Sequence, residues 1–178
     1  MKDQITLQRI ETLHPAVRQE VKNIYENEIV PALSGKAICR FAYTLRTFEE
    51  QNEIYSRGRT KLYDSKGNKL GIVTKAKGGQ SIHNYGLALD IVLLKDTNSD
   101  GTFESVSWET NVDFDKDGKA DWMEVVNIFK KHNWVWGGDW KSFKDRPHFE
   151  KTFGHTWRTL LPKHQAKNFI PGTTYVNL

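Results

Sequence analysis

The stretch at 81–90, Ser-Ile-His-Asn-Tyr-Gly-Leu-Ala-Leu-Asp, constrains the fold of this chain more than any other. It places the imidazole of His83 and the carboxylate of Asp90 at positions i and i+7, with Gly86 between them. A glycine at that point disfavours a helix, and the apolar run at 87–94 is rich in strand-forming residues. We therefore predict a turn that feeds a strand and brings His83 back beside Asp90.

An imidazole and a carboxylate that meet in this way form either a hydrogen-bonded pair near the core or two ligands of a zinc site. A zinc site needs a third ligand, and the best candidate is His148 in the segment Asp145-Arg-Pro-His-Phe-Glu. On an extended segment, Asp145 and His148 would point to opposite faces, but Pro147 bends the path. Three ligands, an open position for water and a spare carboxylate at Asp145 are the parts of zinc-assisted hydrolysis.

The composition is that of a globular chain. With 178 residues, of which 38% are hydrophobic, it can bury a core without disulfides, and Cys39 is expected to be a buried thiol. No apolar run approaches the ~20 residues of a membrane span. The first nine residues lack the apolar core of a signal peptide, so we expect a chain made in the cytoplasm, although a signal removed earlier would leave no trace.

Charge is distributed unevenly along the chain. Residues 96–124 contain nine acidic residues and two lysines, a net charge of −7, whereas the whole chain carries +4, so the remainder carries +11. A basic body favours an anionic partner such as nucleic acid or a bacterial wall polymer, and it is also common on a solvated surface with no partner. Charge alone does not choose among these.

The acidic segment contains a twelve-residue calcium-loop pattern at 113–124, Asp-Phe-Asp-Lys-Asp-Gly-Lys-Ala-Asp-Trp-Met-Glu. Carboxylates stand at positions 1, 3 and 5, glycine at 6, an acid at 9 and glutamate at 12. The alternative is a solvated acidic loop. The expected calcium ligands are the carboxylates of Asp113, Asp115, Asp117, Asp121 and Glu124 and the backbone carbonyl of Lys119.

A helix is predicted on only one side of this loop. An apolar stripe that includes Trp122 and Phe129 predicts a helix after the loop, and no such pattern precedes it, so it is half an EF-hand at most. The segment Asp96–Asp100 repeats the first half of the pattern, but Ser107 replaces the final glutamate. Whether that segment binds a second ion stays open.

Three regular elements are predicted before the central stretch. A helix begins at Pro15, runs past Tyr25 and is ended by Pro31 and Gly35. A strand follows at 37–45, with Cys39, Phe41, Tyr43 and Leu45 on one face. The pair Thr47 and Glu50 forms a capping box, which begins a helix at 47–55. The polar segment 61–77 is expected to be a loop or hairpin.

Two further features border a possible cleft. Arg46, at the junction of strand and helix, is positioned either to reach into a cleft or to remain solvated. The aromatic stretch 133–140 combines bulky rings with paired glycines. Trp136 and Trp140 are therefore expected either to line a substrate cleft or to pack at the end of a strand.

The motifs Ser81-x-His83-x-x-Gly86-x-Ala88-x-Asp90, Trp136-Gly-Gly-x-Trp140 and Asp145-x-Pro-His148-Phe-Glu150 occur in this order. Together they resemble the D-Ala-D-Ala carboxypeptidase family of zinc peptidases, within the wider lysostaphin, D-Ala-D-Ala and hedgehog metallopeptidase group. Similar segments at 46–59 and 73–80 extend the likeness to about residues 37–150. The resemblance is strongest to phage endolysins that cut the L-Ala–D-Glu bond of peptidoglycan.

The resemblance implies a role for each matched residue. It places zinc on His83, Asp90 and His148, the general base at Asp145, and a substrate- or oxyanion-binding arginine at Arg46. Some relatives carry Glu at the position of Asp145. Substrate contacts are expected from Ser81, Gln51, Trp136 and Trp140. The implied fold is α+β, a small antiparallel sheet with flanking helices and zinc at its open face. The calcium-like segment is not part of the family's core motif.

These observations predict a single zinc peptidase domain over residues 1–178, with an acidic calcium-loop insertion at about 96–124. The expected activity is hydrolysis of peptidoglycan stem peptides, at the L-Ala–D-Glu bond, by a monomer that acts on the bacterial cell wall and not on nucleic acid. A D-Ala-D-Ala carboxypeptidase and a non-catalytic zinc- and calcium-binding module are the alternatives. Intact Asp145 and Arg46 favour an enzyme over a binding module. Endopeptidase and carboxypeptidase differ in how the cleft closes at one end, which the sequence does not specify.

Overall fold

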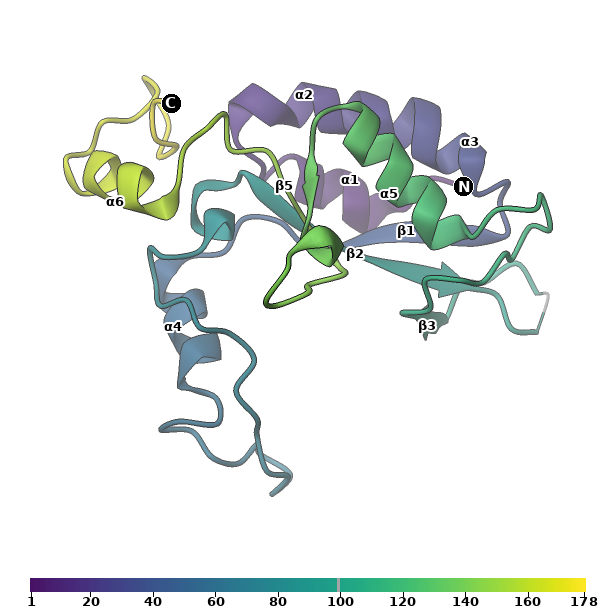
Figure 1. Cartoon of the computed structure of the whole chain (residues 1–178), viewed down its shortest axis with the longest axis horizontal. Helices are drawn as coiled ribbons and strands as arrows, with labels where there is room; N and C mark the ends of the chain where they lie inside the picture. The colour runs from purple at the N-terminus through teal and green to yellow at the C-terminus, as the bar shows by residue number, and fades with distance from the viewer. Residues whose placement is uncertain (99) are drawn as a thin grey trace.

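Strand β2 (Ala88–Lys95) lies at the centre of one antiparallel sheet in the computed structural model, which describes residues 1–98 and 100–178 (Figure 1). Its residues 90–95 pair with β1 (Ala37–Tyr43). On its other side, β5 (His148–Glu150) pairs with its first half and β3 (Ser105–Ser107) with its end, and β4 (Val135–Trp136) pairs with β5. This arrangement confirms the predicted α+β fold with a small antiparallel sheet.

Helices account for most of the remaining regular structure. They are α1 (Gln4–Ile10), α2 (Pro15–Ile24), the π-helical turn η1 (Tyr25–Ile29), α3 (Val30–Ala32), α4 (Phe48–Ser56), the 3₁₀ turn η2 (Ile82–Tyr85), α5 (Asp121–Lys131), the 3₁₀ turn η3 (Gly137–Asp139) and α6 (Trp157–Gln165). In Figure 1, α1, α2 and α5 lie together on one side of the sheet, whereas α4 and the segment after it extend away from it. In the part of the chain that the structure describes, no helix combines the length and apolar character needed to span a membrane.

Alternate residues of β2 point to two different faces of the sheet, one that packs in the main core and one that carries Asp90. Leu89, Ile91 and Leu93 are fully buried in the main core, which they share with side chains of α2 and α5. Because successive side chains of a strand point to opposite faces, Asp90 faces the other way, on the side of the small cluster that contains Val92 and Leu94. Asp90, one of the expected zinc ligands, therefore lies on the sheet face that α1, α2 and α5 leave uncovered.

Several sequence predictions hold and some need correction. The strand at 87–94 and the helix capped by Thr47 and Glu50 are confirmed, and Cys39 is buried. The first long helix ends at Ala32, between Pro31 and Gly35 as predicted, but it passes through a π-helical turn that was not predicted. A missing proline N–H is one of the irregularities that such a turn accommodates. Helices α1 and α6 were not predicted, and the single-domain organisation stays a prediction.

The end of β1 also departs from the simple alternation. Its register with β2 shifts between Phe41 and Tyr43, so the strand bulges there. Tyr43 was expected on the same strand face as Phe41, which is fully buried, but Tyr43 is 54% exposed, and Thr44 is buried instead. The bulge turns the Tyr43 ring towards the face of the sheet that carries Asp90.

Candidate active site

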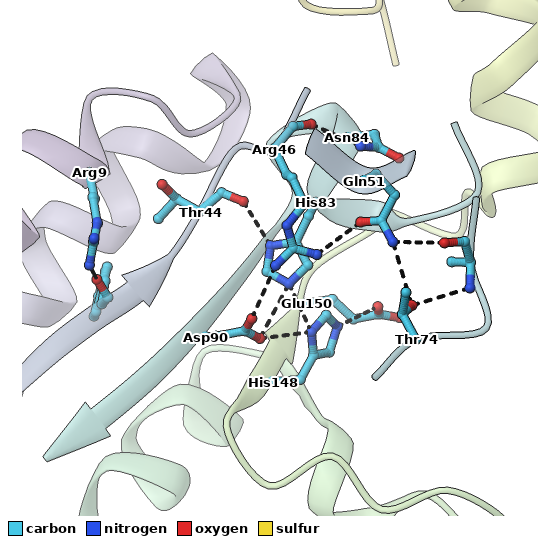
Figure 2. Close-up of polar contacts among 12 residues, drawn as sticks. Arg9, Thr44, Arg46, Gln51, Thr74, His83, Asn84, Asp90, His148 and Glu150 are labelled. Atoms are coloured by element: carbon cyan, nitrogen blue, oxygen red, sulfur yellow. Dashed lines mark hydrogen bonds and ion pairs between the residues drawn. The ribbon is translucent and has the colours of Figure 1, made fainter. Parts of the chain in front are cut away.

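His83 and Asp90 meet as predicted, through a tight turn. The 3₁₀ turn η2 ends at Gly86, whose φ of 70° lies in the left-handed region. A Cβ there would lie 2.7 Å from the backbone nitrogen of His14, so only glycine fits. The turn brings the Nε2 atom of His83 to 3.2 Å from Oδ1 of Asp90 (Figure 2).

His148 joins this pair through strand pairing. It lies directly opposite Asp90 in the antiparallel pair of β5 and β2, so both side chains point to the same face. Its Nδ1 atom lies 3.2 Å from Oδ1 of Asp90 and 3.2 Å from Nε2 of His83. The structure therefore brings together the three residues expected to bind zinc, and they come from a turn and two paired strands.

The outer nitrogens of the two imidazoles have fixed partners. Nδ1 of His83 lies 2.7 Å from the carbonyl oxygen of Thr44, and Nε2 of His148 lies 2.9 Å from a carboxylate oxygen of Glu150 (Figure 2). Both partners are acceptors, so each outer nitrogen carries a hydrogen, and in the neutral ring the inner nitrogen presents a lone pair. This role in orienting a histidine was not predicted for Thr44 or Glu150. The spacing i, i+2 on a strand indicates that Glu150 shares the face of His148, whereas a backbone carbonyl leaves no trace in the sequence.

The three inner atoms form a site for a cation. When both imidazoles are neutral, two lone pairs and a carboxylate oxygen face one another at 3.2 Å, and acceptors cannot satisfy one another. Ligand atoms bound tetrahedrally to zinc at its usual bond lengths of about 2.0–2.1 Å lie about 3.3 Å apart, which fits this spacing. His83, Asp90 and His148 can thus bind a metal ion.

The same geometry perturbs the acid–base properties of the cluster. Burial alone would raise the pKa of Asp90, but the facing imidazoles of His83 and His148 hold that pKa far below its usual range. Burial alone would lower the pKa of His148, but hydrogen bonds to Asp90 and Glu150 raise it to about 9. A proton and a metal ion therefore compete for the same position.

Arg46 lies at the cluster and is not a solvated surface arginine. Its side chain is 12% exposed, and Nη2 lies 3.7 Å from Oδ2 of Asp90. The guanidinium lies over the ring of Tyr43, and Nη1 donates a hydrogen bond to Gln51 at 2.9 Å. Its Nε atom is buried and has no hydrogen-bond partner among the described residues. An arginine held in this way presents donors to the cleft.

Gln51 requires a correction, because it was expected to contact substrate. Its side chain is fully buried. It accepts the hydrogen bond from Arg46 and donates to the carbonyl oxygen of Ala76 at 2.8 Å (Figure 2). Gln51 therefore positions Arg46 and the segment around residue 76, since α4 turns this residue towards the protein interior.

Asp145 reaches the cleft through a turn, as expected from Pro147. The N–H of His148 donates to the carbonyl oxygen of Asp145 at 3.2 Å, and the N–H of Asp145 donates to Gly137 at 3.0 Å. A Cβ at Gly137 would lie 2.4 Å from that Asp145 oxygen, so this close approach needs glycine. The Asp145 side chain lines the same cleft as the cluster. Burial raises the pKa of Asp145, and the charge of Asp90 adds to the rise.

The two candidate tryptophans have different positions. The ring of Trp140 lies 5.1 Å from that of His148, and Trp140 lines the cleft. Trp136 is only 9% exposed, belongs to the main core, and donates from Nε1 to the carbonyl oxygen of Arg146 at 2.6 Å. The substrate contact expected of Trp136 is therefore wrong, because the strand end around it is packed.

The cleft above the cluster has a volume of about 680 Å³. Ser81 lines it, as does Phe143, which sequence analysis did not single out. Cations stand on its walls at Arg57 and Lys75. The arrangement offers a metal position, a carboxylate with a raised pKa, and nearby guanidinium donors, which is a set suited to hydrolysis of a polar substrate.

The residues of the predicted calcium loop also converge, away from this cleft. Carboxylate oxygens of Asp113, Asp115 and Asp121 lie within 4.8 Å of one another, and so do those of Asp115, Asp117 and Glu124. The second acidic segment brings together Asp96, Asp100 and Glu104. Ser99, within that segment, lies outside the described residues.

Comparison with known proteins identifies the family. A D-alanyl-D-alanine carboxypeptidase family model matches residues 74–151, which include the cluster and Asp145. The peptidoglycan L-alanyl-D-glutamate endopeptidase CwlK of Bacillus subtilis (strain 168) is 45% identical over 139 residues, which span 78% of this chain and 72% of CwlK. The chain belongs to the D-alanyl-D-alanine carboxypeptidase family of peptidases.

This membership confirms the resemblance seen in the sequence motifs. Among solved structures, the L-Ala D-Glu endopeptidase ChiX of Serratia marcescens is similar, with 21% identity and a TM-score of 0.45 over 84% of this chain and 88% of ChiX.

Proposed function

We propose that this chain is a zinc-dependent endopeptidase that hydrolyses the L-Ala–D-Glu bond of peptidoglycan stem peptides. The observation that carries the proposal is the cluster of His83, Asp90 and His148, whose three inner acceptors face one another in the wall of a cleft that also holds Asp145 and Arg46. The bond specificity is that named for the relative CwlK.

In this proposal, His83, Asp90 and His148 hold the zinc. When bound, zinc supplies a Lewis acid that polarises the scissile carbonyl and activates water. The chain prepares the site beforehand: Thr44 and Glu150 fix the ring orientation of the two histidines, so that a lone pair of each points inward.

Asp145 is the proposed general base. Its raised pKa makes it a better proton acceptor than an ordinary surface aspartate. It accepts the proton of the attacking water, and in its protonated form it can pass that proton to the departing amine. The turn at 145–148 holds it next to the cluster for both steps.

Arg46 is the proposed donor to the substrate. Held by Gln51 and Tyr43, its guanidinium donates either to the oxygen that gains negative charge during attack or to a substrate carboxylate. A D-glutamate beside the cleaved bond brings a carboxylate, which the cations Arg57 and Lys75 on the cleft walls favour. Ser81 and Trp140 are the remaining proposed substrate contacts.

We place the site of action at the bacterial cell wall and not on nucleic acid, in keeping with the substrate of this relative. All residues of the proposed site come from one chain, so a monomer is expected to be active. A D-Ala-D-Ala carboxypeptidase is the second candidate, because the matching family model carries that description.

Mass spectrometry of purified peptidoglycan digested with the zinc-loaded protein tests the proposal. New N-terminal D-Glu is the expected product, and release of free D-Ala would instead support a carboxypeptidase. His83→Ala protein is the control, and any product that it also forms comes from a contaminant. Binding to peptidoglycan without any cleavage would overturn the enzyme assignment and leave a binding module.

A further inference from the structure

The loop at 113–124 gathers more negative charge than its own residues neutralise. Its two groups of carboxylates share Asp115, so five acidic side chains form one continuous cluster. Among the described residues, the cation that pairs with them is Lys119, whose Nζ lies 3.0 Å from Asp117 and 3.7 Å from Glu124. That side chain is largely exposed and pairs with one oxygen each of Asp117 and Glu124, so the other carboxylates of the cluster form no ion pair with it.

Buried oxygens without partners mark the inner part of the cluster. The side chain of Asp121 is 0% exposed. Its Oδ2 atom accepts a hydrogen bond from the N–H of Phe114 at 2.6 Å, but Oδ1 has no hydrogen-bond partner in the described part of the chain. The same holds for Oδ2 of Asp115 and Oε2 of Glu124. A buried carboxylate oxygen without a donor is costly, and three in one cluster indicate a missing cation.

The electrostatics agree with this geometry. Carboxylate oxygens of Asp113, Asp115 and Asp121 lie within 4.8 Å of one another, as do those of Asp115, Asp117 and Glu124. In the absence of a cation, these side chains repel one another.

We propose that the loop at 113–124 is a calcium site, separate from the catalytic cluster. The donors are oxygens only, which suits a hard cation, and their number suits Ca²⁺ better than Mg²⁺, because Mg²⁺ keeps several of its waters. The ligands are the carboxylates of Asp113, Asp115, Asp117, Asp121 and Glu124 and the backbone carbonyl of Lys119.

The acidic segment at 96–104 lacks the feature on which the calcium assignment rests: among the described residues, it has no buried carboxylate oxygen without a hydrogen-bond partner. Oxygens of Asp96, Asp100 and Glu104 accept hydrogen bonds from backbone N–H groups or threonine hydroxyls of the same loop. Asp100 and Glu104 are exposed, so water can hydrate their charges. The proposal therefore covers the loop at 113–124 alone.

A bound calcium ion would also affect the catalytic cleft indirectly. Asp121 begins helix α5, and the next residue, Trp122, is fully buried. Trp122 lines a second cavity, of about 460 Å³, together with Asp145, Arg146 and Pro147. An ion that fixes the first turn of α5 therefore supports the turn that carries the proposed base, without contacting it.

Isothermal titration of the full, zinc-loaded chain with CaCl₂ tests the site. We expect binding with a Kd of roughly 10⁻³ M or lower. At a calcium concentration about 100-fold above Kd, the melting temperature should rise by roughly 5–10 °C. Glu124→Gln and Asp121→Asn should each lose the binding heat. The matched control Glu26→Gln, which removes a partly buried charge paired with Lys2, should keep it.

Three further measurements keep the result interpretable. Glu124→Gln removes one repelling charge, so its calcium-free melting temperature should be at or above that of the wild type, which shows that lost binding is not unfolding. Lys119→Met should bind calcium at least as tightly as the wild type, because only its backbone carbonyl is a ligand. His83→Ala should bind calcium normally, which separates this site from the zinc site. An absence of binding heat up to millimolar calcium, or wild-type binding in both Glu124→Gln and Asp121→Asn, would overturn the proposal.

Discussion

The catalytic cluster and the acidic loop both gather metal ligands, but they do so by different means. His83, Asp90 and His148 are placed by a tight turn and by strand register, and hydrogen bonds to Thr44 and Glu150 hold the two imidazoles. The carboxylates at 113–124 stand on irregular backbone, apart from the first turn of α5. The first site is therefore formed by the sheet before an ion arrives, whereas the second needs its ion to relieve repulsion.

The largest expected effect follows from removing one ligand of the preformed site. His148→Ala should abolish measurable peptidoglycan hydrolysis and lower the zinc content to near zero, because two ligands remain. Since strand pairing places the ligands, the circular dichroism spectrum should stay like that of the wild type. Metal analysis checks the assignment. Unchanged zinc content in both His148→Ala and His83→Ala would show that the ion lies elsewhere.

Asp145→Asn should separate catalysis from metal binding. The change removes a charge and little volume, so zinc and fold should be retained while the rate falls on the order of 10²–10⁴, the usual contribution of a positioned base. Asp139→Asn is a matched control, because Asp139 is exposed and pairs with Lys130. If Asp145→Asn retained most of its activity, the base would be a different residue, and Glu150 would be the next to examine.

Arg46→Lys tests whether the fixed guanidinium matters beyond its charge. Lysine keeps the positive charge but loses the forked donors that Gln51 orients, so kcat/KM should fall by roughly 10–10²-fold. Steady-state kinetics on a defined stem peptide measure the change. Wild-type values in this variant would return Arg46 to a structural role.

Glu150→Gln tests how far the outer hydrogen bonds prepare the cluster. Glutamine can still accept from Nε2 of His148 but without the negative charge, so zinc affinity should fall about 10–100-fold. Competition against a chelator of known zinc affinity measures it. Equal affinity in the variant would mean that strand pairing alone suffices to orient His148.

The smallest expected effect is a change in amide hydrogen exchange, which compares the two regions directly. Removal of zinc should leave the protection of amides in the β2–β5 pair nearly unchanged, since those strands pair without the ion. Removal of calcium with a calcium-selective chelator should increase exchange in residues 113–124 and in the first turn of α5. Equal loss of protection in both regions would remove the distinction between a preformed site and an ion-dependent one.

The sequence predicted the parts of the site that depend on local pattern. Gly86 and the strand after it indicated the turn, and the spaced motifs supplied His148 and Asp145. It did not predict burial decided by tertiary packing. Gln51 and Trp136 lie in the matched motifs, yet both are covered by neighbours. The β1 bulge places Tyr43 at the cleft, and no residue in that part of the sequence predicts a bulge. The carbonyl of Thr44 is a backbone group, which any residue would offer.

The alternation of residues along strand β2 limits where this chain can tolerate insertions and deletions. Its alternate residues serve two regions: Leu89, Ile91 and Leu93 fill the core, and Asp90 serves the cluster. One residue inserted or deleted between Gly86 and Asp90 would exchange these faces, sending the carboxylate into the core and a leucine to the metal position. Beyond Lys95, where β2 ends, that constraint weakens. Natural variation and engineered insertions are therefore expected to accumulate after Lys95, in the part of the chain where the acidic segment stands.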